Sequence, residues 1–471
     1  MTLSYTARAD SDIRTVAQTR PGDWKPLSVK AYRTDGAVVV DGTITLYVVE
    51  KAKKKMMTRI LLTVAIVGLL GAFGAAAALM LATDWLTPWW GWKPLPDRTA
   101  PTHQTFEPEY RGFAALATQA LVEERARIGA PSLSAAVVLE DSLVWAGTAG
   151  WARVDPPEPA TTKTVYRIGS TSKAVTATAM ARLVASRQLD LDAPIERYVE
   201  TVPNPQWASL TPRQLASHTA GLPGYAENRD FPGVWQTIRL ARSFGGVEEA
   251  LSVFDGTQLL FEPGAGFHYS SFDTTVNAWV MASITGHRYP MLLRELVLHP
   301  LGLIDTGVER AGDLPDTIAS FYRVAGGRVR PWRDVDLSLK WPGGGLLSTS
   351  TDLARLGSAW LDESFLPASL REDFWTPVRL VSGEVNEQSY AMGWRVNRSR
   401  RIELDGGPVR EVHHGGVSKG AMSWLVVYPD LELVVAININ ARAESFGDFA
   451  AAETRLTRLV IAHMLQPEPA P

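Results

Sequence analysis

The longest apolar run along the chain is ILLTVAIVGLLGAFGAAAALMLA, which covers residues 60–82 and contains no charge. At about 1.5 Å per residue this run makes a helix roughly 34 Å long, and a hydrocarbon core is about 30 Å thick. Soluble helices rarely continue this far without a polar face. We therefore expect one N-terminal transmembrane helix, with residues 56–83 as the spanning segment.

The residues on the two sides of this run differ in character. A basic cluster precedes it and a tryptophan cluster follows it: Lys51, Lys53, Lys54, Lys55 and Arg59 before, and Trp85, Trp89, Trp90 and Trp92 after. Cations mark the cytoplasmic flank of a span, and indoles mark the membrane interface. The pattern predicts a single-pass protein of the cell inner membrane, with residues 1–55 as a cytoplasmic tail and the part after Trp92 exported.

A cleaved signal peptide is the alternative interpretation of the same segment. Its apolar core normally spans about 7–15 residues, which is shorter than this run. Met56 or Met57 would serve as the start, because MMTRILLTVAIVGLL resembles a signal sequence by itself, and residues 1–55 would then be a mis-assigned extension. Alternating β-branched residues in Gly36–Glu50, around Asp41-Gly42, instead predict a hairpin there. Both interpretations deliver the C-terminal part across the membrane, and the anchored form is favoured.

The remainder of the chain reads as a linker followed by one domain. Residues 84–109 are predicted to be an aromatic belt and proline-rich linker, since 93–108 hold four prolines. The domain at 110–467 is predicted to begin with a helix and two strands, at Gly112–Ile128, Ser132–Val138 and Ser142–Thr148. It is predicted to end with the reverse order, two strands and a helix, at Met422–Tyr428, Leu431–Asn438 and Phe449–Leu465. This order predicts an α+β fold with an antiparallel sheet built from both ends of the domain, flanking helices and a mainly helical subdomain.

Composition narrows the chemistry. The net charge of −3 and the lack of a recognisable binding motif argue against a nucleic-acid partner. The chain contains no cysteine, which removes disulfides and thiol nucleophiles. Its eight histidines follow no metal-ligand spacing, so a metal site is not expected.

The segment VYRIGSTSKAVTATAMA, Val165–Ala181, carries a Ser-x-x-Lys pattern at the predicted start of a helix. Ser170 and Lys173 would lie one turn apart on the same helix face. Free N–H groups at a helix start favour negative charge, and a partly desolvated lysine beside a serine can take its proton. By itself the tetrapeptide fits a capping serine and a solvated lysine better, so its context decides.

Four further segments supply that context: LTPRQLASHTAGLPGY at Leu210–Tyr225, LFEPGAGFHYSSFD at Leu260–Asp273, WPGGGLLSTSTDL at Trp341–Leu353 and VHHGGVSKGAMSWL at Val412–Leu425. With RIGSTSK, their order and spacing resemble the class C β-lactamase and D-alanyl-D-alanine carboxypeptidase superfamily, the penicillin-binding group. The likeness is greatest to its mitochondrial serine β-lactamase-like peptidase branch. It covers residues 110–465 and implies a β-lactamase/transpeptidase-like fold.

The resemblance also implies roles for single residues. Ser170 would be the nucleophile that forms an acyl-enzyme, with Lys173 as its general base. Tyr269 would pass a proton to the leaving group, which a phenol with a pKa near about 10 can do only if cations stabilise its charged form. His413, His414 and Gly415 would replace the Lys-Thr-Gly strand motif, with His413 lining the site. The N–H groups of Ser170 and Gly416 would form the oxyanion hole. No metal or organic cofactor is implied.

Two departures from the family pattern bear on the substrate. Many members have Tyr-x-Asn, in which the asparagine holds the substrate amide, whereas this chain has Ser271. Serine offers one donor where an amide offers two. His413 in place of lysine weakens recognition of a substrate carboxylate, because an unperturbed histidine is mostly uncharged at neutral pH. Both changes argue against true β-lactamase activity.

Two other features are predicted to be incidental. Gly416–Gly420 matches G-x-S-x-G, but that nucleophile elbow needs a following helix and the next residues are strand-like, so Ser418 is expected in a loop. His218 is expected to be structural.

The sequence thus predicts a membrane-anchored, exported serine hydrolase that acts on a small-molecule or peptide substrate. Peptidase or D-alanyl carboxypeptidase activity ranks first, esterase second and β-lactamase third. The alternative is a catalytically weak scaffold or receptor that binds peptides or self-assembles. Ser170, Lys173 and Tyr269 favour the enzyme, because a scaffold has no use for all three.

Overall fold

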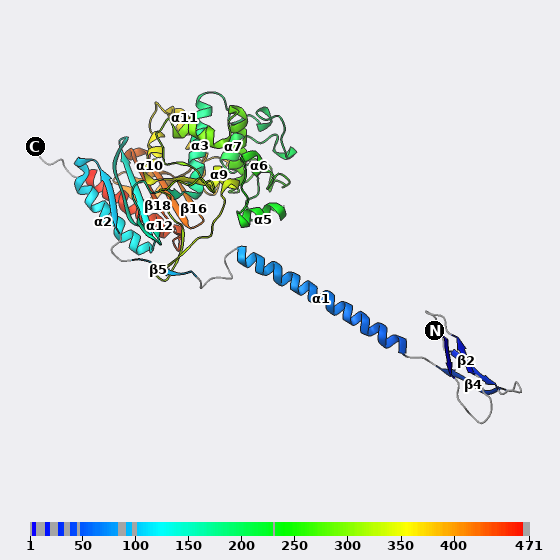
Figure 1. The fold of residues 1–471 in the computed structure, drawn as a ribbon. Coiled ribbons are helices and arrows are strands. Elements are labelled where there is room, and N and C mark those ends of the chain that lie inside the picture. The colour runs from blue at the N-terminus through cyan, green and yellow to red at the C-terminus, as the bar shows by residue number, and fades with distance from the viewer. Residues whose placement is uncertain are drawn as a thin grey trace, which may run out of the picture. The chain divides into compact units, whose positions relative to one another are not determined.

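The computed structural model describes residues 2–5, 15–18, 27–32, 38–44, 48–82, 91–96, 101–228 and 231–464. The chain divides into two compact units, Met1–Leu86 and Thr87–Pro471 (Figure 1). Each unit is described by itself.

The first unit begins with paired strands. β1 (Thr2–Tyr5) pairs with β2 (Thr15–Gln18), and β3 (Leu27–Tyr32) pairs with β4 (Val38–Ile44), both antiparallel. The predicted hairpin around Asp41-Gly42 is wrong, because both residues lie inside β4, opposite Lys30 and Val29 of β3. The β-branched alternation continues through this dipeptide as one strand.

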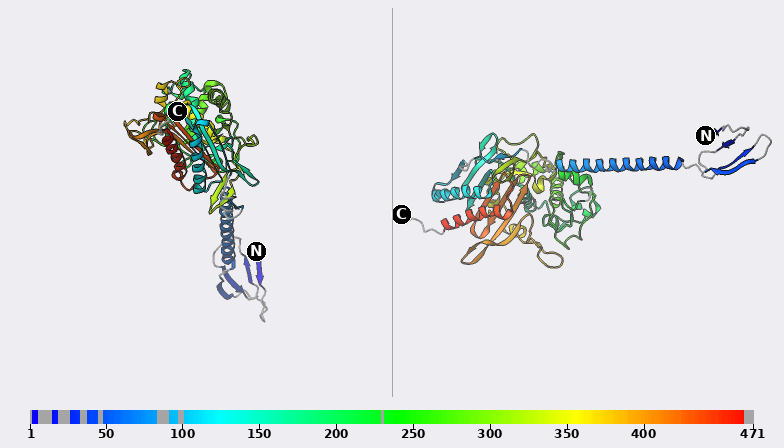
Figure 2. Two further views of the ribbon diagram at one scale, coloured as in Figure 1. Left: turned by 90° about the vertical axis from the view of Figure 1, so that its left-hand side faces the viewer. Right: turned by 90° about the horizontal axis from the view of Figure 1, so that it is seen from below.

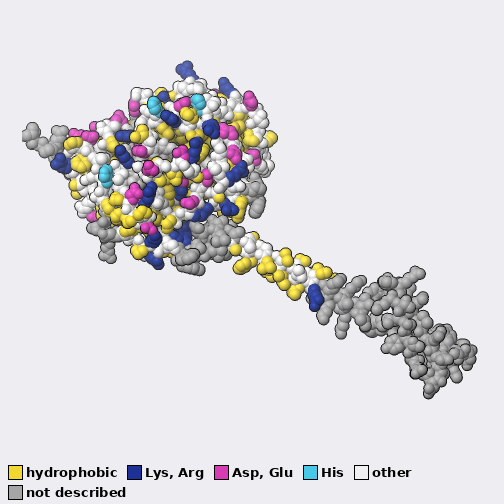
Figure 3. Space-filling view, in the orientation of Figure 1, with side chains coloured by type: hydrophobic (Ala, Val, Ile, Leu, Met, Phe, Trp, Pro, Cys, Tyr) yellow, Lys and Arg dark blue, Asp and Glu magenta, His cyan; other side chains and the backbone are white. Residues whose placement is uncertain are grey.

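α1 (Val48–Ala82) contains the predicted apolar run. Within it, Arg59–Ala77 has a mean hydropathy of 2.4, none of it is buried, and it is long and apolar enough to cross a membrane. Figure 3 shows hydrophobic side chains along the described part of this helix, and Arg59 is the basic residue at its start. Trp85, Trp89 and Trp90 lie outside the described residues. Trp92 belongs to the second unit, where the guanidinium carbon of Arg330 lies 5.6 Å from its ring.

The second unit is organised around an antiparallel sheet whose strand order is β15-β16-β17-β18-β7-β8-β6. The strands are β15 (Arg395–Leu404), β16 (Gly407–Ser418), β17 (Ala421–Tyr428), β18 (Leu433–Ile439), β7 (Ser132–Leu139), β8 (Ser142–Val154) and β6 (Thr102–Phe106), with β9 (Pro157–Pro159) beside β8. The pairing of β18 with β7 joins the two ends of the domain, since Ala436 lies opposite Ala136. The predicted sheet built from both termini is confirmed.

Both faces of this sheet are covered. α2 (Arg111–Ile128) and α12 (Phe446–Met464) pack on one face, and α10 (Ser350–Ala359) packs on the other (Figures 1 and 2). Along β7, Ala135 and Val137 belong to the core under α2 and α12, whereas Ala136 and Val138 face the opposite core. A strand buried on both faces needs no polar alternation, which explains the apolar run Ala135–Leu139 in β7.

The helical subdomain is inserted between β8 and β15. Its helices are α3 (Ser172–Ala185), α4 (Pro212–Ala216), α5 (Phe231–Arg239), α6 (Val247–Leu251), α7 (Ser271–Thr285), α8 (Tyr289–Leu293), α9 (Trp341–Gly344) and α11 (Ala368–Phe374). Short strands accompany them: β10 (Tyr166–Arg167), β14 (Leu346–Ser348) and β11 (Gly307–Val308) form one small sheet, and β12 (Tyr322–Ala325) and β13 (Arg328–Pro331) form another with β5 (Lys93–Pro94). The mixed α+β plan is as predicted.

The segment expected to be a linker, residues 84–109, belongs in part to this unit. β5 pairs with β13, and β6 forms the edge of the main sheet opposite β8. Prolines lack an N–H group but are tolerated in edge strands and at strand ends. β5 and β6 are both edge strands, so the prolines of this segment are compatible with its place in the sheets. The folded domain therefore starts before residue 110.

Candidate active site

Ser170 lies in a short 3-10 turn, η2 (Gly169–Thr171), directly before α3. The side chain of Ser172 ties this turn together by donating to the Gly169 carbonyl at 2.7 Å and accepting from the Leu346 amide at 3.2 Å. Gly169 has a φ of +51°, and a Cβ there would come within 2.7 Å of the Val417 backbone. Ser170 is half-buried while its neighbours are buried, so the turn presents this hydroxyl to incoming molecules.

Lys173 follows one turn later and is 2% exposed. Its amine lies 3.4 Å from Ser170 Oγ, 2.9 Å from Ser271 Oγ and 2.7 Å from the Gly343 carbonyl oxygen. Three acceptors match the three N–H groups of an ammonium. The predicted proximity of Ser170 and Lys173 is confirmed, and Gly343, from the glycine-rich segment at Trp341–Leu353, is part of the same cluster.

Tyr269 lies in the loop before α7, with its ring centroid 4.7 Å from Lys173 Nζ and 5.1 Å from the Arg395 guanidinium carbon. Burial by itself raises the pKa of its phenol. The charges of Lys173 and Arg395 and hydrogen bonds with Ser170 and Lys173 outweigh burial, so the pKa lies below its ordinary value. The prediction that cations must stabilise the charged phenol is met, and Arg395 contributes beside Lys173.

Ser271, at the first position of α7, connects Lys173 to a second tyrosine. Its hydroxyl accepts from Lys173, and a side-chain hydrogen bond links it to the half-buried Tyr225. Gly343 packs against it, since a Cβ on Gly343 would lie 3.1 Å from Ser271 Cβ. Serine fits this confined position and keeps one bond to Lys173.

β16 passes along the other side of Ser170. Thr171 Oγ1 donates to the His414 carbonyl at 3.3 Å, so the backbone polar groups of His414 face η2. A Cβ on Gly416 would overlap the Ile168 carbonyl and come within 2.9 Å of the Ser170 nitrogen. The Gly416 and Ser170 backbones are therefore close neighbours.

The two histidines of β16 point to opposite faces of the sheet. His414 is fully buried, its Nε2 lies 2.9 Å from Tyr390 Oη, and its ring is 6.4 Å from that of Tyr269. His413 instead packs 4.6 Å from the ring of Trp424, and Gly415 faces the same way. The structure thus brings His414 to the Tyr269 cluster, and it does not bring His413 or Gly415 there.

The histidine pKa values agree with this arrangement. Burial, followed by the charges of Arg395 and Arg401, lowers the pKa of His413 to about 3. Burial, followed by Arg395 and Lys173, lowers the pKa of His414 well below its ordinary value. Both imidazoles are therefore neutral at pH 7, as predicted for His413. Of these two histidines, only His414 has a pKa that is lowered by the charge of Lys173.

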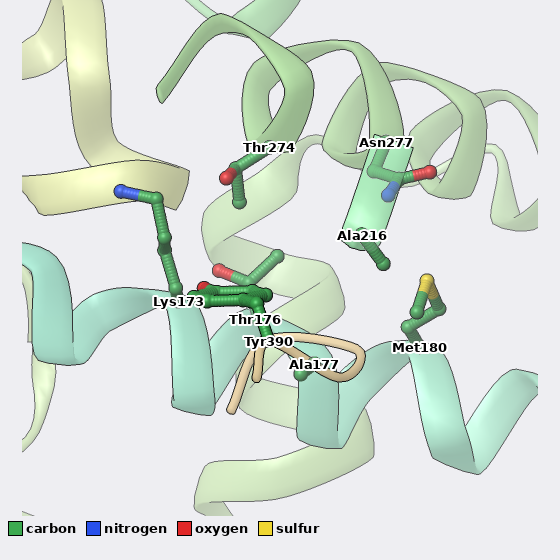
Figure 4. A pocket seen from close by; sticks show the side chains of 9 residues that line it. Lys173, Thr176, Ala177, Met180, Ala216, Thr274, Asn277 and Tyr390 are labelled. Atoms are coloured by element: carbon green, nitrogen blue, oxygen red, sulfur yellow. The ribbon is translucent and has the colours of Figure 1, made fainter. Parts of the chain in front are cut away.

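A small cavity of about 20 Å³ lies behind the cluster, between α3 and α7. Lys173, Met180 and Asn277 line it, together with Thr176, Ala177, Ala216, Thr274, Tyr390 and Gly393. Figure 4 shows the Lys173 amine pointing away from Met180 and Asn277. This cavity lies beside the aliphatic part of the Lys173 side chain and is too small to hold a substrate.

Sequence reasoning missed Tyr390 and Arg395, which enclose the cluster. The Arg395 guanidinium carbon lies 5.0 Å from the Tyr390 ring, and Arg395 also donates to Gln388. Neither residue belongs to a segment with a recognisable spacing. Ser418 ends β16 and is followed by β17 without a helix, so the prediction that it is not a nucleophile elbow is confirmed.

Comparison with known proteins gives a consistent result. Residues 117–458 match the family described as Beta-lactamase. The human "Serine beta-lactamase-like protein LACTB, mitochondrial" is 28% identical over 386 residues, which cover 64% of this chain and 70% of that protein. The match in this relative agrees with the resemblance inferred from the motifs.

Solved structures share the fold. A D-stereospecific amidohydrolase from Streptomyces sp. is 26% identical with a TM-score of 0.59, covering 72% of this chain and 98% of that one. The D-amino acid amidase from Ochrobactrum anthropi SV3 is 21% identical with a TM-score of 0.62, covering 75% and 99%. Since the family match extends over most of the 471 residues, this protein belongs to the beta-lactamase family.

Proposed function

We propose that the protein is a serine hydrolase that cleaves peptide, amide or ester bonds through an acyl-enzyme on Ser170. The observation that carries this proposal is the convergence of a half-buried serine, a buried lysine and a phenol of lowered pKa in one cluster. A nucleophile beside its base is the usual signature of covalent catalysis.

The first step moves the Ser170 hydroxyl proton to the Lys173–Tyr269 pair as Oγ attacks the substrate carbonyl. Lys173 already donates to three acceptors, which suits a cation, so Tyr269 as phenolate is the immediate proton acceptor and Lys173 stabilises it. This refines the expected assignment of Lys173 as the base. The intermediate then collapses, the C–N or C–O bond breaks, and Tyr269 returns the proton to the leaving group.

The oxyanion formed on attack needs two N–H donors. The Ser170 amide at the start of α3 and the Gly416 amide on β16 are the proposed pair, since they are neighbours at the edge of β16. One such donor contributes about 3–4 kcal/mol to the transition state. Water then attacks the acyl-enzyme carbonyl and Tyr269 accepts a proton from this water. The bond between the acyl carbon and Ser170 Oγ breaks, Tyr269 returns the proton to Ser170 Oγ, and the acid product leaves.

Peptides or amides rank first as substrates, esters second and β-lactams third. The related Streptomyces protein is named as a D-stereospecific amidohydrolase, which supports amides and D-residues as the first class to test. Ser271 lowers the rank of β-lactams, because its hydroxyl oxygen already accepts from Lys173 and it lacks the second donor of an asparagine.

We also propose that α1 anchors the hydrolase in the cell inner membrane with the domain outside the cytoplasm. The apolar stretch Arg59–Ala77 and the lysines before it support this placement. Protease added to intact spheroplasts should then remove the domain and leave a protected N-terminal fragment, whereas a fully protected chain would contradict the orientation.

The experiment that tests the activity is labelling of the purified domain with a fluorophosphonate and a fluorescent penicillin. Wild-type protein should react and Ser170→Ala should not, and a panel of acyl-D-alanine peptides, simple esters and a chromogenic cephalosporin then ranks substrates. Labelling of neither protein would favour a scaffold or receptor. Labelling of both would assign the reaction to another nucleophile.

A further inference from the structure

A buried histidine–carboxyl pair lies directly behind Tyr269. His218 Nδ1 is 2.7 Å from Asp273 Oδ2, and the two side chains are 1% and 0% exposed. The His218 ring lies 4.5 Å from the Tyr269 ring and 4.7 Å from the Tyr390 ring. Neither His218 nor Asp273 takes part in the catalytic steps proposed above, although His218 packs on Tyr269 and Asp273 lies on the helix that follows it.

His218 also holds the backbone on both sides of Tyr269. Its carbonyl accepts from the His268 amide at 2.9 Å, and its Nδ1 accepts from the Ser270 amide at 3.4 Å. Asp273 lies four residues after Tyr269, on the first turn of α7. Both neighbours of Tyr269 and the helix that follows it are therefore fixed to one residue: His268 through the His218 backbone carbonyl, and Ser270 and Asp273 through its ring.

His218 occupies this position with a φ of +62°, at the end of α4. This left-handed backbone conformation is uncommon for residues with a side chain. It sends the His218 carbonyl toward His268 while the ring turns toward Asp273. A strained backbone at such a place is typical of sites that other interactions hold in position.

The contacts favour a pair without net charge. The Ser270 amide directs its N–H at Nδ1 over 3.4 Å, which favours an unprotonated Nδ1 that accepts and a shared proton on Asp273. Burial acts in the same direction, since it raises the pKa of Asp273 well above its ordinary value and lowers that of His218 well below. An ionised Asp273 would oppose the effect of Lys173 and Arg395 on the phenol.

We propose that His218 and Asp273 are positioning residues for Tyr269: a neutral pair sharing one proton, which holds the phenol toward Lys173 without placing a negative charge beside it. This inference rests on the proposed role of Tyr269 in proton transfer. It assigns no contact with substrate to either residue.

Three variants test the pair. Asp273→Asn keeps a neutral donor for Nδ1, Asp273→Ala removes it, and His218→Asn removes the ring while tolerating a positive φ. Glu453→Gln is the matched control, because Glu453 is another buried carboxyl, bonded to Tyr428 and Thr457 and carried by α12. The full-length protein in detergent is used throughout.

The first readout is the ultraviolet titration of Tyr269, obtained as the difference between each variant and the same variant with Tyr269→Phe. This readout does not depend on hydrolysis. Asp273→Ala and His218→Asn should raise the pKa of the Tyr269 phenol, because the ring is released from Lys173 and Arg395. Asp273→Asn and Glu453→Gln should leave it unchanged.

The second readout is the rate of Ser170 labelling against pH. Asp273→Ala and His218→Asn should lower it about 10- to 100-fold near neutral pH, since small misplacements of a catalytic group have effects of this order. Their pH profiles should also move to higher pH, whereas Asp273→Asn should stay within about threefold of wild type.

The outcomes separate the two claims. An unmoved phenol titration in Asp273→Ala and His218→Asn would overturn the positioning role, whatever the labelling rates. Loss of rate in Asp273→Asn equal to that in Asp273→Ala would overturn the neutral pair. A phenol that shifts as expected in a protein that Ser170 probes never label would support the pair and contradict the hydrolase.

Discussion

Arg395→Gln probes the electrostatics of the proposed base. The Arg395 guanidinium carbon lies 5.1 Å from the Tyr269 ring, and two charges at this distance interact by about 3 kcal/mol at an effective dielectric constant of about 20. Arg395 is only half-buried, and water reduces this interaction to roughly 1.4 kcal/mol. That energy corresponds to about tenfold in the balance between phenol and phenolate.

The sign of the effect follows from the direction of the pKa. Arg395 helps to hold the pKa of Tyr269 below its ordinary value, so removing it raises this pKa. A base acts when deprotonated, and its rate therefore rises with pH through its pKa. Arg395→Gln should react about tenfold more slowly below the rising limb, move that limb to higher pH and approach the wild-type rate above it.

The assay is the second-order rate constant of fluorophosphonate labelling between about pH 5 and about pH 10, within limits set by the stability of the protein. Arg398→Gln is the control, since Arg398 lies on the same strand, is exposed and donates to the Pro408 carbonyl. A loss that is equal at every pH, or a limb that does not move, would refute Tyr269 as the base.

Three further predictions concern packing, stability and substrate. Gly416→Ala should abolish labelling and cost about 1–3 kcal/mol in thermal unfolding, because its Cβ would overlap the Ile168 carbonyl; an active, stable variant would contradict this placement. Arg167→Met should cost about 3–5 kcal/mol, since it leaves Glu309 buried and unpaired, and a calorimetric loss below about 1 kcal/mol would contradict it. Ser271→Asn should increase cephalosporin acylation relative to ester hydrolysis, because it restores an amide donor, and an unchanged ratio would count against that role.

Elements with long, regular patterns could be predicted from the sequence. α2 and the strands at both ends of the domain have apolar positions whose period is unambiguous, and they occur where expected. Ser170 and Lys173 were also predictable, because a separation of three residues on a helix fixes their proximity without knowledge of the fold.

Other features depend on tertiary pairing and could not be predicted in this way. Whether His413 or His414 faces the cluster depends on strand register, and a shift of one residue reverses every side chain of β16. The sequence of β6 predicts a linker because an edge strand need not be apolar on either face, and the residues of β6 are exposed. Arg395 and Tyr390 reach Tyr269 from far along the chain, where no spacing rule applies.

The most direct test of the central claim is mass spectrometry of the intact protein and its peptides after reaction with a slowly hydrolysed acyl probe. The account predicts one covalent adduct on the peptide that contains Ser170, absent from Ser170→Ala and formed more slowly by Tyr269→Phe. An adduct on another residue, such as Ser418, or turnover that persists in Ser170→Ala, would contradict it.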